Sequence, residues 1–157
     1  MAEPTTSMED YLETIYELIE DKGYARVSDI ASALDLQPSS VTRMIQRLDE
    51  QDFVVYERYR GLILTGKGED VGRAMRRRHR TLEKFLRLIG VDDEQTVQED
   101  VEGIEHHVSR RTIECIRQLV DFAVERPEWF EDFSEHHHRS RNSETGAVPP
   151  DSPRHPG

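Results

Sequence analysis

The sequence predicts a mostly α-helical fold with one small β-hairpin. Apolar residues recur at helical spacing through most of residues 7–125, and two short runs of β-forming residues flank residue 60. Hydrophobic residues make up only 35% of the 157 residues, which is a small share for a globular domain. This share favours thin helical layers around modest cores over a single large core.

The composition also excludes several classes of protein. A single cysteine, Cys115, excludes a disulfide framework and a cysteine-type zinc finger. No apolar run approaches the ~18–20 residues that span a bilayer, and the first residues lack the basic and apolar regions of a signal peptide. We therefore expect a soluble cytoplasmic protein with no membrane partner.

Charge is distributed unevenly along the chain, whose formal net charge is −11. Residues 71–90 contain seven bases and one acid, whereas residues 91–107 contain seven acids and no base. A negative total does not exclude nucleic-acid binding, because local patches rather than bulk charge decide it. Crowded carboxylates repel one another, so the acid-rich segment makes a cation a candidate partner.

The first predicted helix lies between Ser7, a candidate cap, and Gly23, which follows the last helical turn. Its apolar stripe is formed by five residues: Tyr11, Leu12, Ile15, Leu18 and Ile19. Asp10 and Glu13 lie on the opposite face of this helix. A face of this kind is solvated unless it meets a partner.

Residues 27–34 and 38–51 are expected to form two helices separated by a short turn, with Pro38 in the favoured first turn of the second helix. The second helix buries Val41, Met44, Ile45 and Leu48. Its other face is free of acids and presents six polar residues: Ser39, Ser40, Thr42, Arg43, Gln46 and Arg47. This is a helix-turn-helix pattern, in which such a face enters the major groove of DNA.

A β-hairpin is predicted directly after these helices. Residues 53–58 and 62–64 have strand propensity, and Tyr59-Arg60-Gly61 forms the tip. Arg58 and Arg60 would lie where a wing meets phosphate or the minor groove. The combination predicts an N-terminal winged helix-turn-helix that binds double-stranded DNA, and the alternative is a winged helix used only for protein contacts.

Three further helices are predicted, over residues 66–89, 93–108 and 111–125. The last two have more apolar surface than so small a chain needs. A helical dimer interface explains this surface, and a dimer also matches palindromic operators. The predicted fold is therefore a winged helix-turn-helix followed by a C-terminal helical dimerisation domain.

These elements divide the chain into three parts. Residues 1–70 are expected to form the DNA-binding domain, and residues 71–134 a linker helix with the metal-binding and dimerisation domain. Residues 135–157 lack apolar periodicity and are expected to be a disordered tail.

The segment V-E-G-I-E-H-H at residues 101–107 is the strongest candidate site. On a helix, Glu102, Glu105 and His106 lie within about 100° of one another, whereas His107 lies on the opposite edge. Two carboxylates and one imidazole suit a fairly hard divalent ion. The same charges also fit a solvated helix edge. Asp10 and Glu13 from the first helix and His79 from the long helix would complete a site for one or two ions.

Three motifs resemble those of the manganese transport regulators, which are metal-dependent transcription factors of the diphtheria-toxin-repressor-like family. They are S-M-E-D-Y-L-E-T-I-Y at 7–16, P-S-S-V-T at 38–42 and D-V-E-G-I-E-H-H at 100–107. The resemblance runs in register over roughly residues 7–125. It implies a homodimeric repressor of metal-ion uptake genes that binds Mn²⁺, with two ions per protomer. Matched by motif, the implied ligands are Asp10, Glu13, His79, Glu102, Glu105 and His106.

In the iron-sensing branch of this family, Met and Cys stand at the positions of Asp10 and Glu102. Carboxylates at both positions favour Mn²⁺, because manganese prefers hard oxygen ligands. The implied mechanism is that metal clamps the first helix, and with it the DNA-binding domain, to the dimer domain.

Two other functions are compatible with these residues. One is a winged-helix regulator that senses iron or a non-metal signal. The other is a metal-dependent hydrolase, but residues 102–106 read E-G-I-E-H and lack the patterns of zinc peptidases. We therefore expect a regulator rather than an enzyme, and no small-molecule substrate.

Overall fold

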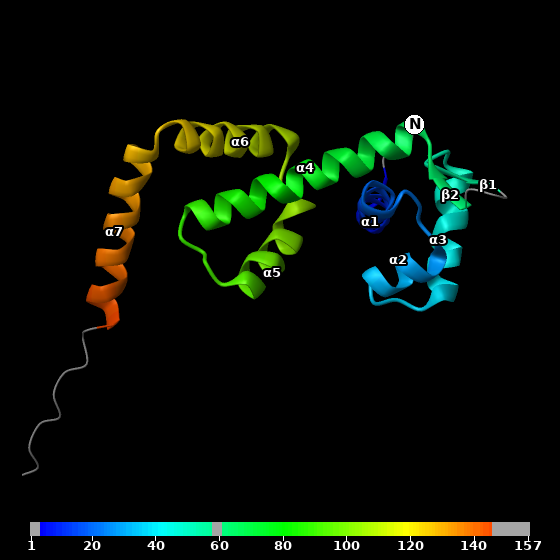
Figure 1. The fold of residues 1–157 in the computed structure, drawn as a ribbon, viewed down its shortest axis with the longest axis horizontal. Coiled ribbons are helices and arrows are strands. Elements are labelled where there is room, and N and C mark those ends of the chain that lie inside the picture. The colour runs from blue at the N-terminus through cyan, green and yellow to red at the C-terminus, as the bar shows by residue number, and fades with distance from the viewer. Residues whose placement is uncertain (1–3, 58–60, 146–157) are drawn as a thin grey trace, which may run out of the picture.

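The structure is a computed structural model that describes residues 4–57 and 61–145. Its elements in chain order are α1 (Thr6–Lys22), α2 (Val27–Ala33), α3 (Pro38–Glu50), β1 (Val54–Glu57), β2 (Gly61–Leu64), α4 (Gly66–Leu88), α5 (Glu94–Glu105), α6 (Arg110–Glu125) and α7 (Pro127–Thr145). Figure 1 shows α4 as a long rod that connects α1, α2, α3 and the hairpin to the C-terminal helices. None of the helices in the described ranges is long and apolar enough to cross a membrane.

The mostly helical fold with a small hairpin is confirmed. β1 and β2 pair antiparallel from Val54 opposite Leu64 to Glu57 opposite Gly61. Thr65 then connects the hairpin to α4, because its hydroxyl accepts a hydrogen bond from the amide of Gly68 and donates one to the carbonyl of Phe53. This cap fixes the hairpin at the start of the long helix.

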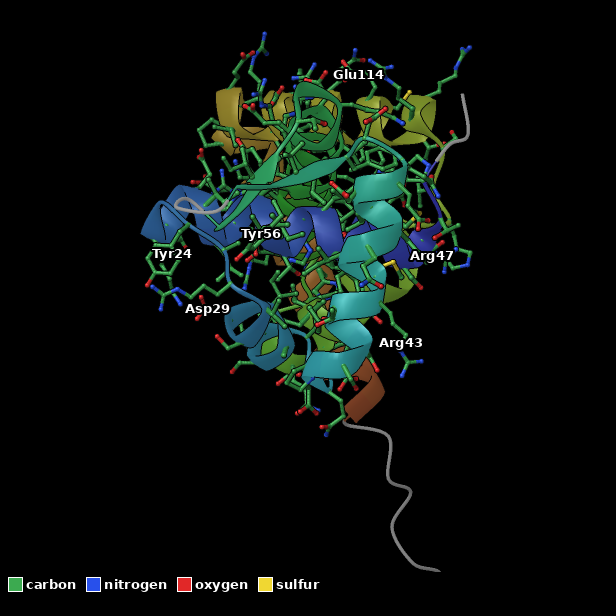
Figure 2. All side chains as sticks on the ribbon, turned by 90° about the vertical axis from the view of Figure 1, so that its right-hand side faces the viewer. Tyr24, Asp29, Arg43, Arg47, Tyr56 and Glu114 are labelled. Atoms are coloured by element: carbon green, nitrogen blue, oxygen red, sulfur yellow. The ribbon has the colours of Figure 1, made fainter. Side chains whose placement is uncertain are left out.

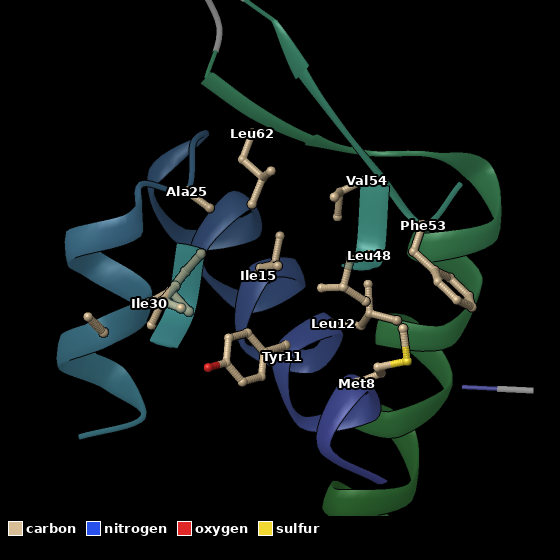
Figure 3. Close-up of a cluster of buried hydrophobic side chains, with 12 residues drawn as sticks. Met8, Tyr11, Leu12, Ile15, Ala25, Ile30, Leu48, Phe53, Val54 and Leu62 are labelled. Atoms are coloured by element: carbon tan, nitrogen blue, oxygen red, sulfur yellow. The ribbon is translucent and has the colours of Figure 1, made fainter. Parts of the chain in front are cut away.

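Two modest apolar cores form, in agreement with the small hydrophobic share. The first lies among α1, α2, α3 and the hairpin, and Figure 3 shows its side chains, including Leu12, Ile15 and Phe53, meeting around α1. The second lies between α4 and α5 and is built on Leu82 and Val101. The rigid α4 helix thus extends from one core to the other.

A glycine sets the distance between α1 and α4. A Cβ atom at Gly72 would lie 2.6 Å from the carbonyl oxygen of Leu12 and 2.7 Å from Cβ of Tyr16. Real Cβ contacts are not so short, so any larger residue would push the two helices apart. Gly72 therefore allows α1 to lie directly against α4.

The structure corrects two predicted helix boundaries. α1 begins at Thr6, and its N-cap is Thr5, which makes no side-chain cap, rather than Ser7. α5 ends at Glu105 rather than near residue 108, so His106 is its C-cap. The backbone of His106 keeps a right-handed helical conformation, with φ −82° and ψ −14°. For this reason His106 stays close to the direction predicted from the helical register.

The expectation of a disordered segment from residue 135 onward does not hold for residues 135–145, which continue α7. The remainder of that segment lies outside the described residues. The absence of an apolar stripe in this segment predicts only that few of its side chains are buried. A helix can still form there, because Glu, His and Arg tolerate helical backbone. Figure 1 shows α7 at the edge of the molecule, where the His137 side chain lies against Gly90 after α4.

The Gly72 contact makes a stability prediction. We expect Gly72→Ala to lower the free energy of unfolding by about 1–3 kcal/mol, because the new methyl group overpacks the α1–α4 contact. Gly103→Ala in α5 is the matched control, since a Cβ there meets nothing within 4 Å. That control should be stabilising by about 0.5–1 kcal/mol. Urea unfolding measures both, and equal effects of the two substitutions would contradict the contact.

Candidate metal centre

A cavity of about 660 Å³ lies among α1, α4 and α5. Figure 1 shows α1 and α5 on the same side of α4, so that all three helices contribute to its walls. All six residues predicted as metal ligands line this cavity: Asp10, Glu13, His79, Glu102, Glu105 and His106. Segments far apart in the sequence are thus brought to one place. His107 does not line the cavity and is exposed, as the helical register predicted.

Glu13, His79 and Glu105 form the inner part of the cavity, where one ligand atom from each lies within 4.8 Å of the others. Nδ1 of His79 is 3.3 Å from Oε2 of Glu105 and 3.9 Å from Oε1 of Glu13. Glu105 is only 4% exposed, and its Oε2 atom is buried without a hydrogen bond. A buried carboxylate oxygen that lacks a donor is costly. These residues therefore fit a bound cation.

His106 organises the outer part of the cavity. Its Nε2 atom lies 2.7 Å from Oδ1 of Asp10, and its Nδ1 atom lies 3.0 Å from Oε2 of Glu9. The same Nε2 atom is 3.6 Å from Oε1 of Glu105. The Glu105 carboxylate therefore has one oxygen near His79 and the other near His106. Glu102 lines the same cavity with an exposed side chain.

The electrostatics of the cavity favour protonated carboxyls. Burial raises the pKa of Glu13 to about 7, and the Glu105 carboxylate adds to this shift while His79 opposes it. Burial also raises the pKa of Asp10, against the opposite effect of His106. The Glu105 carboxylate raises the pKa of His79, because it interacts with the protonated ring. A divalent cation would have to displace these protons.

Two residues that contact lining residues of the cavity were not predicted from the sequence. Glu9 contacts His106, and it precedes Glu13 by four residues, a spacing that places both on one side of a helix. Arg78 donates a hydrogen bond of 2.8 Å to the main-chain oxygen of Glu105. Nothing in the sequence distinguishes Arg78 from its neighbouring arginines, because the contact depends on where α5 ends.

The six polar residues predicted to contact DNA from α3 are all exposed: Ser39, Ser40, Thr42, Arg43, Gln46 and Arg47. Val41 and Leu48 are buried on the other face, as predicted. Figure 2 shows Arg43 and Arg47 projecting from α3 away from the molecule. The two predicted wing residues, Arg58 and Arg60, lie outside the described residues. Tyr56 on β1 is 72% exposed, and no sequence pattern had pointed to it.

Two family models match most of the chain. Residues 3–62 match the N-terminal DNA-binding domain of iron-dependent repressors, and residues 65–129 match their metal-binding and dimerisation domain. The chain is 57% identical over 132 residues to the transcriptional regulator MntR of Shouchella clausii, covering 84% of this chain and 92% of that one. It is 58% identical over 121 residues to MntR of Bacillus subtilis, with 77% and 84% covered.

Solved structures with the same fold are also related in sequence. The manganese regulator SloR aligns with a TM-score of 0.64 and 29% identity, over 77% of this chain. A manganese-dependent transcriptional repressor in complex with manganese aligns with a TM-score of 0.63 and 28% identity, over 73% of this chain. The alignments span only 55% and 53% of those two longer chains.

The two matched domains and the identity of 57% and 58% to these two regulators lead to one conclusion. The chain belongs to the family of iron-dependent repressors, with an N-terminal DNA-binding domain and a metal-binding and dimerisation domain.

Proposed function

We propose that this chain is a manganese-dependent transcriptional repressor of metal-ion uptake genes, whose metal centre holds the DNA-binding region against the dimerisation region. The observation that carries this proposal is the buried carboxylate of Glu105 at the meeting point of α1, α4 and α5, whose Oε2 atom has no hydrogen bond. Membership of a family of DNA-binding repressors supports the expectation that the chain is a regulator and not an enzyme.

The chemistry of the donors supports manganese. The proposed ligands are four carboxylates, Asp10, Glu13, Glu102 and Glu105, and two imidazoles, His79 and His106. Sulfur is absent from this set, and oxygen-rich ligation favours Mn²⁺ over softer ions. The printed names of the relatives MntR and SloR point to the same metal.

We propose two ions per protomer. The two oxygens of Glu105 are directed to different histidines, with Oε2 at 3.3 Å from His79 and Oε1 at 3.6 Å from His106. This arrangement supports a bridging role for Glu105 between two neighbouring subsites. Glu13 and His79 would serve the inner subsite, and Asp10, Glu102 and His106 the outer one.

The chain's own residues explain why metal would control DNA binding. Asp10 and Glu13 lie on α1, which packs in the core that also supports α3, whereas Glu102 and Glu105 lie on α5. Divalent cations supply positive charge that offsets the mutual repulsion of these carboxylates. Without that charge, the carboxylates of α1 and α5 repel one another when they are ionised, and the orientation of α3 is less constrained. Metal can favour the state in which α3 is held in place only because it binds that state more tightly than the state in which α3 is less constrained.

The proposed DNA interface is the polar face of α3 together with the hairpin. Ser39, Ser40, Thr42 and Arg43 are proposed to reach base edges or phosphates, with Gln46 and Arg47 further along and Arg58 and Arg60 on the wing. A face without acids lowers repulsion from phosphate. Homodimerisation is proposed through the C-terminal helices, since Leu119 and Phe122 on α6 are 39% and 44% exposed. The proposed place of action is the cytoplasm, where the operator DNA is found.

Substitutions at the metal centre test the proposal. We expect Glu102→Ala and His106→Ala to abolish Mn²⁺-dependent DNA binding while leaving a folded dimer, because each removes a metal ligand. His107→Ala is the matched control, since His107 is exposed and outside the cavity. Fluorescence anisotropy of an operator duplex, with Mn²⁺ or chelator at fixed salt, measures the effect. A large loss in the His107 variant would contradict the proposed site.

Substitution of Arg43 tests the DNA interface. We expect Arg43→Ala to weaken operator binding by roughly tenfold or more, as expected when a charged contact to a base or phosphate is lost. Arg87→Ala provides the control, because Arg87 is paired with Glu83 and Glu94 away from α3. Binding is measured by anisotropy at saturating Mn²⁺. If both variants bind like the wild type, α3 does not present Arg43 to DNA.

The pKa of Glu13 predicts the pH dependence of metal binding. Glu13 has a pKa of about 7 in the metal-free protein, so it is mostly protonated at pH 6 and mostly ionised near pH 8. Because metal requires the ionised form, Mn²⁺ affinity should fall roughly tenfold between pH 7.5 and 6.0. His79, whose pKa is also raised, acts in the same direction.

Calorimetry in buffers of different ionisation enthalpy measures both the affinity and the protons released. Glu13→Gln should bind Mn²⁺ more weakly and with a shallower dependence on pH. Affinity that does not change over this pH range would exclude Glu13 and His79 as ligands.

A further inference from the structure

A second cavity, of about 580 Å³, lies between α4 and α6 and shares no lining residue with the metal centre. Its charged walls are five arginines and two acids: Arg73, Arg77, Arg78, Arg110, Arg117, Asp70 and Glu114. The five arginines exceed the two acids by three positive charges, although the formal net charge of the whole chain is −11. The basic character of the cavity is therefore a local arrangement and not a consequence of composition.

Helical spacing aligns these arginines into two facing rows. Arg73 and Arg77 are four residues apart on α4, so they lie on the same side of the helix. Arg110 and Arg117 are seven residues apart on α6, which corresponds to roughly 10 Å along the helix axis. The positive charge thus extends over a length greater than a single phosphate group.

Internal contacts neutralise only part of this charge. Arg73 pairs with Glu69, and Arg117 pairs with Glu114 at 2.6 Å and also with Asp121. In contrast, Arg77 and Arg110 form no hydrogen bond or ion pair with any residue in the described part of the chain, although the charge of Arg110 acts on Glu114 over a longer distance. Their guanidinium groups remain available to an anion that enters the cavity.

We propose that this cavity binds a small polyphosphate anion, such as pyrophosphate or the phosphate chain of a nucleotide. Guanidinium groups bind phosphate oxygens through paired hydrogen bonds, and arginine is favoured for this reason over lysine. The volume falls within the range of small-molecule sites. The extended rows favour an anion with two or more phosphate groups over inorganic phosphate.

The location of the cavity favours a small anion over DNA. Figure 2 shows Glu114, a wall residue of the cavity, far from Arg43 and Arg47 on the exposed face of α3. A duplex lying on α3 would therefore not reach the cavity in the same protomer. This proposal does not depend on the proposed metal function.

The test is calorimetric titration of pyrophosphate and ATP into the metal-free full-length protein at low salt. The variant Arg77→Ala with Arg110→Ala removes the two unpaired guanidinium groups. The matched control is Arg80→Ala with Arg111→Ala, which removes two exposed arginines of the same helices that do not line the cavity. Circular dichroism confirms that both variants are folded.

We expect wild type and control to bind pyrophosphate and ATP with similar affinity, and the Arg77/Arg110 variant to bind at least about tenfold more weakly, because two charge-assisted contacts are lost. Adenosine should not bind. The proposal would be overturned if both double variants lost pyrophosphate affinity equally, or if adenosine bound as strongly as ATP. It would also be overturned if the wild type did not bind pyrophosphate at 1 mM. Loss of duplex DNA binding alone in the Arg77/Arg110 variant would assign the cavity to DNA and also overturn it.

Discussion

The close packing of α1 against α4 at Gly72 determines where the acidic face of α1 lies. Because a Cβ atom at this position would meet the main chain of Leu12, the two helices can lie this close only with glycine here. Asp10 and Glu13 are thereby held opposite α5, with His79 on α4 beside them. The metal centre, the N-terminal core and the relation of α3 to α5 all depend on this contact.

The same contact creates an electrostatic cost. It brings Glu13 and Glu105 to one cavity, where burial and like charge raise the pKa of Glu13 to about 7. A structure selected only for stability would give the buried Oε2 atom of Glu105 a hydrogen-bond donor. In the mechanism proposed above, a bound cation supplies the positive charge that this oxygen lacks, so that the contact between α1 and α5 responds to metal.

The sequence by itself predicted most of the secondary structure and the residues that line the candidate site. Helical periodicity and Pro38 at a helix start are local properties, so they predicted the bounds of α3 and α6 closely. The spacing of Glu102, Glu105 and His106 is also local, because neighbours on one helix share a face whatever surrounds them. For the same reason the exclusion of His107 from the site could be predicted.

Only the tertiary structure decided which side chains that are distant in the sequence come into contact, and how deeply each of them is buried. The contacts of Glu9 with His106 and of Arg78 with the main chain of Glu105 depend on how α1, α4 and α5 are placed relative to one another. The continuation of α7 beyond residue 135 was not predicted, because apolar periodicity indicates which side chains are buried and not whether a helix forms. The arginine-lined cavity likewise arises when α6 packs beside α4. Charges separated by more than thirty residues act together only when packing brings them within a few ångströms, and linear spacing carries no information about that distance.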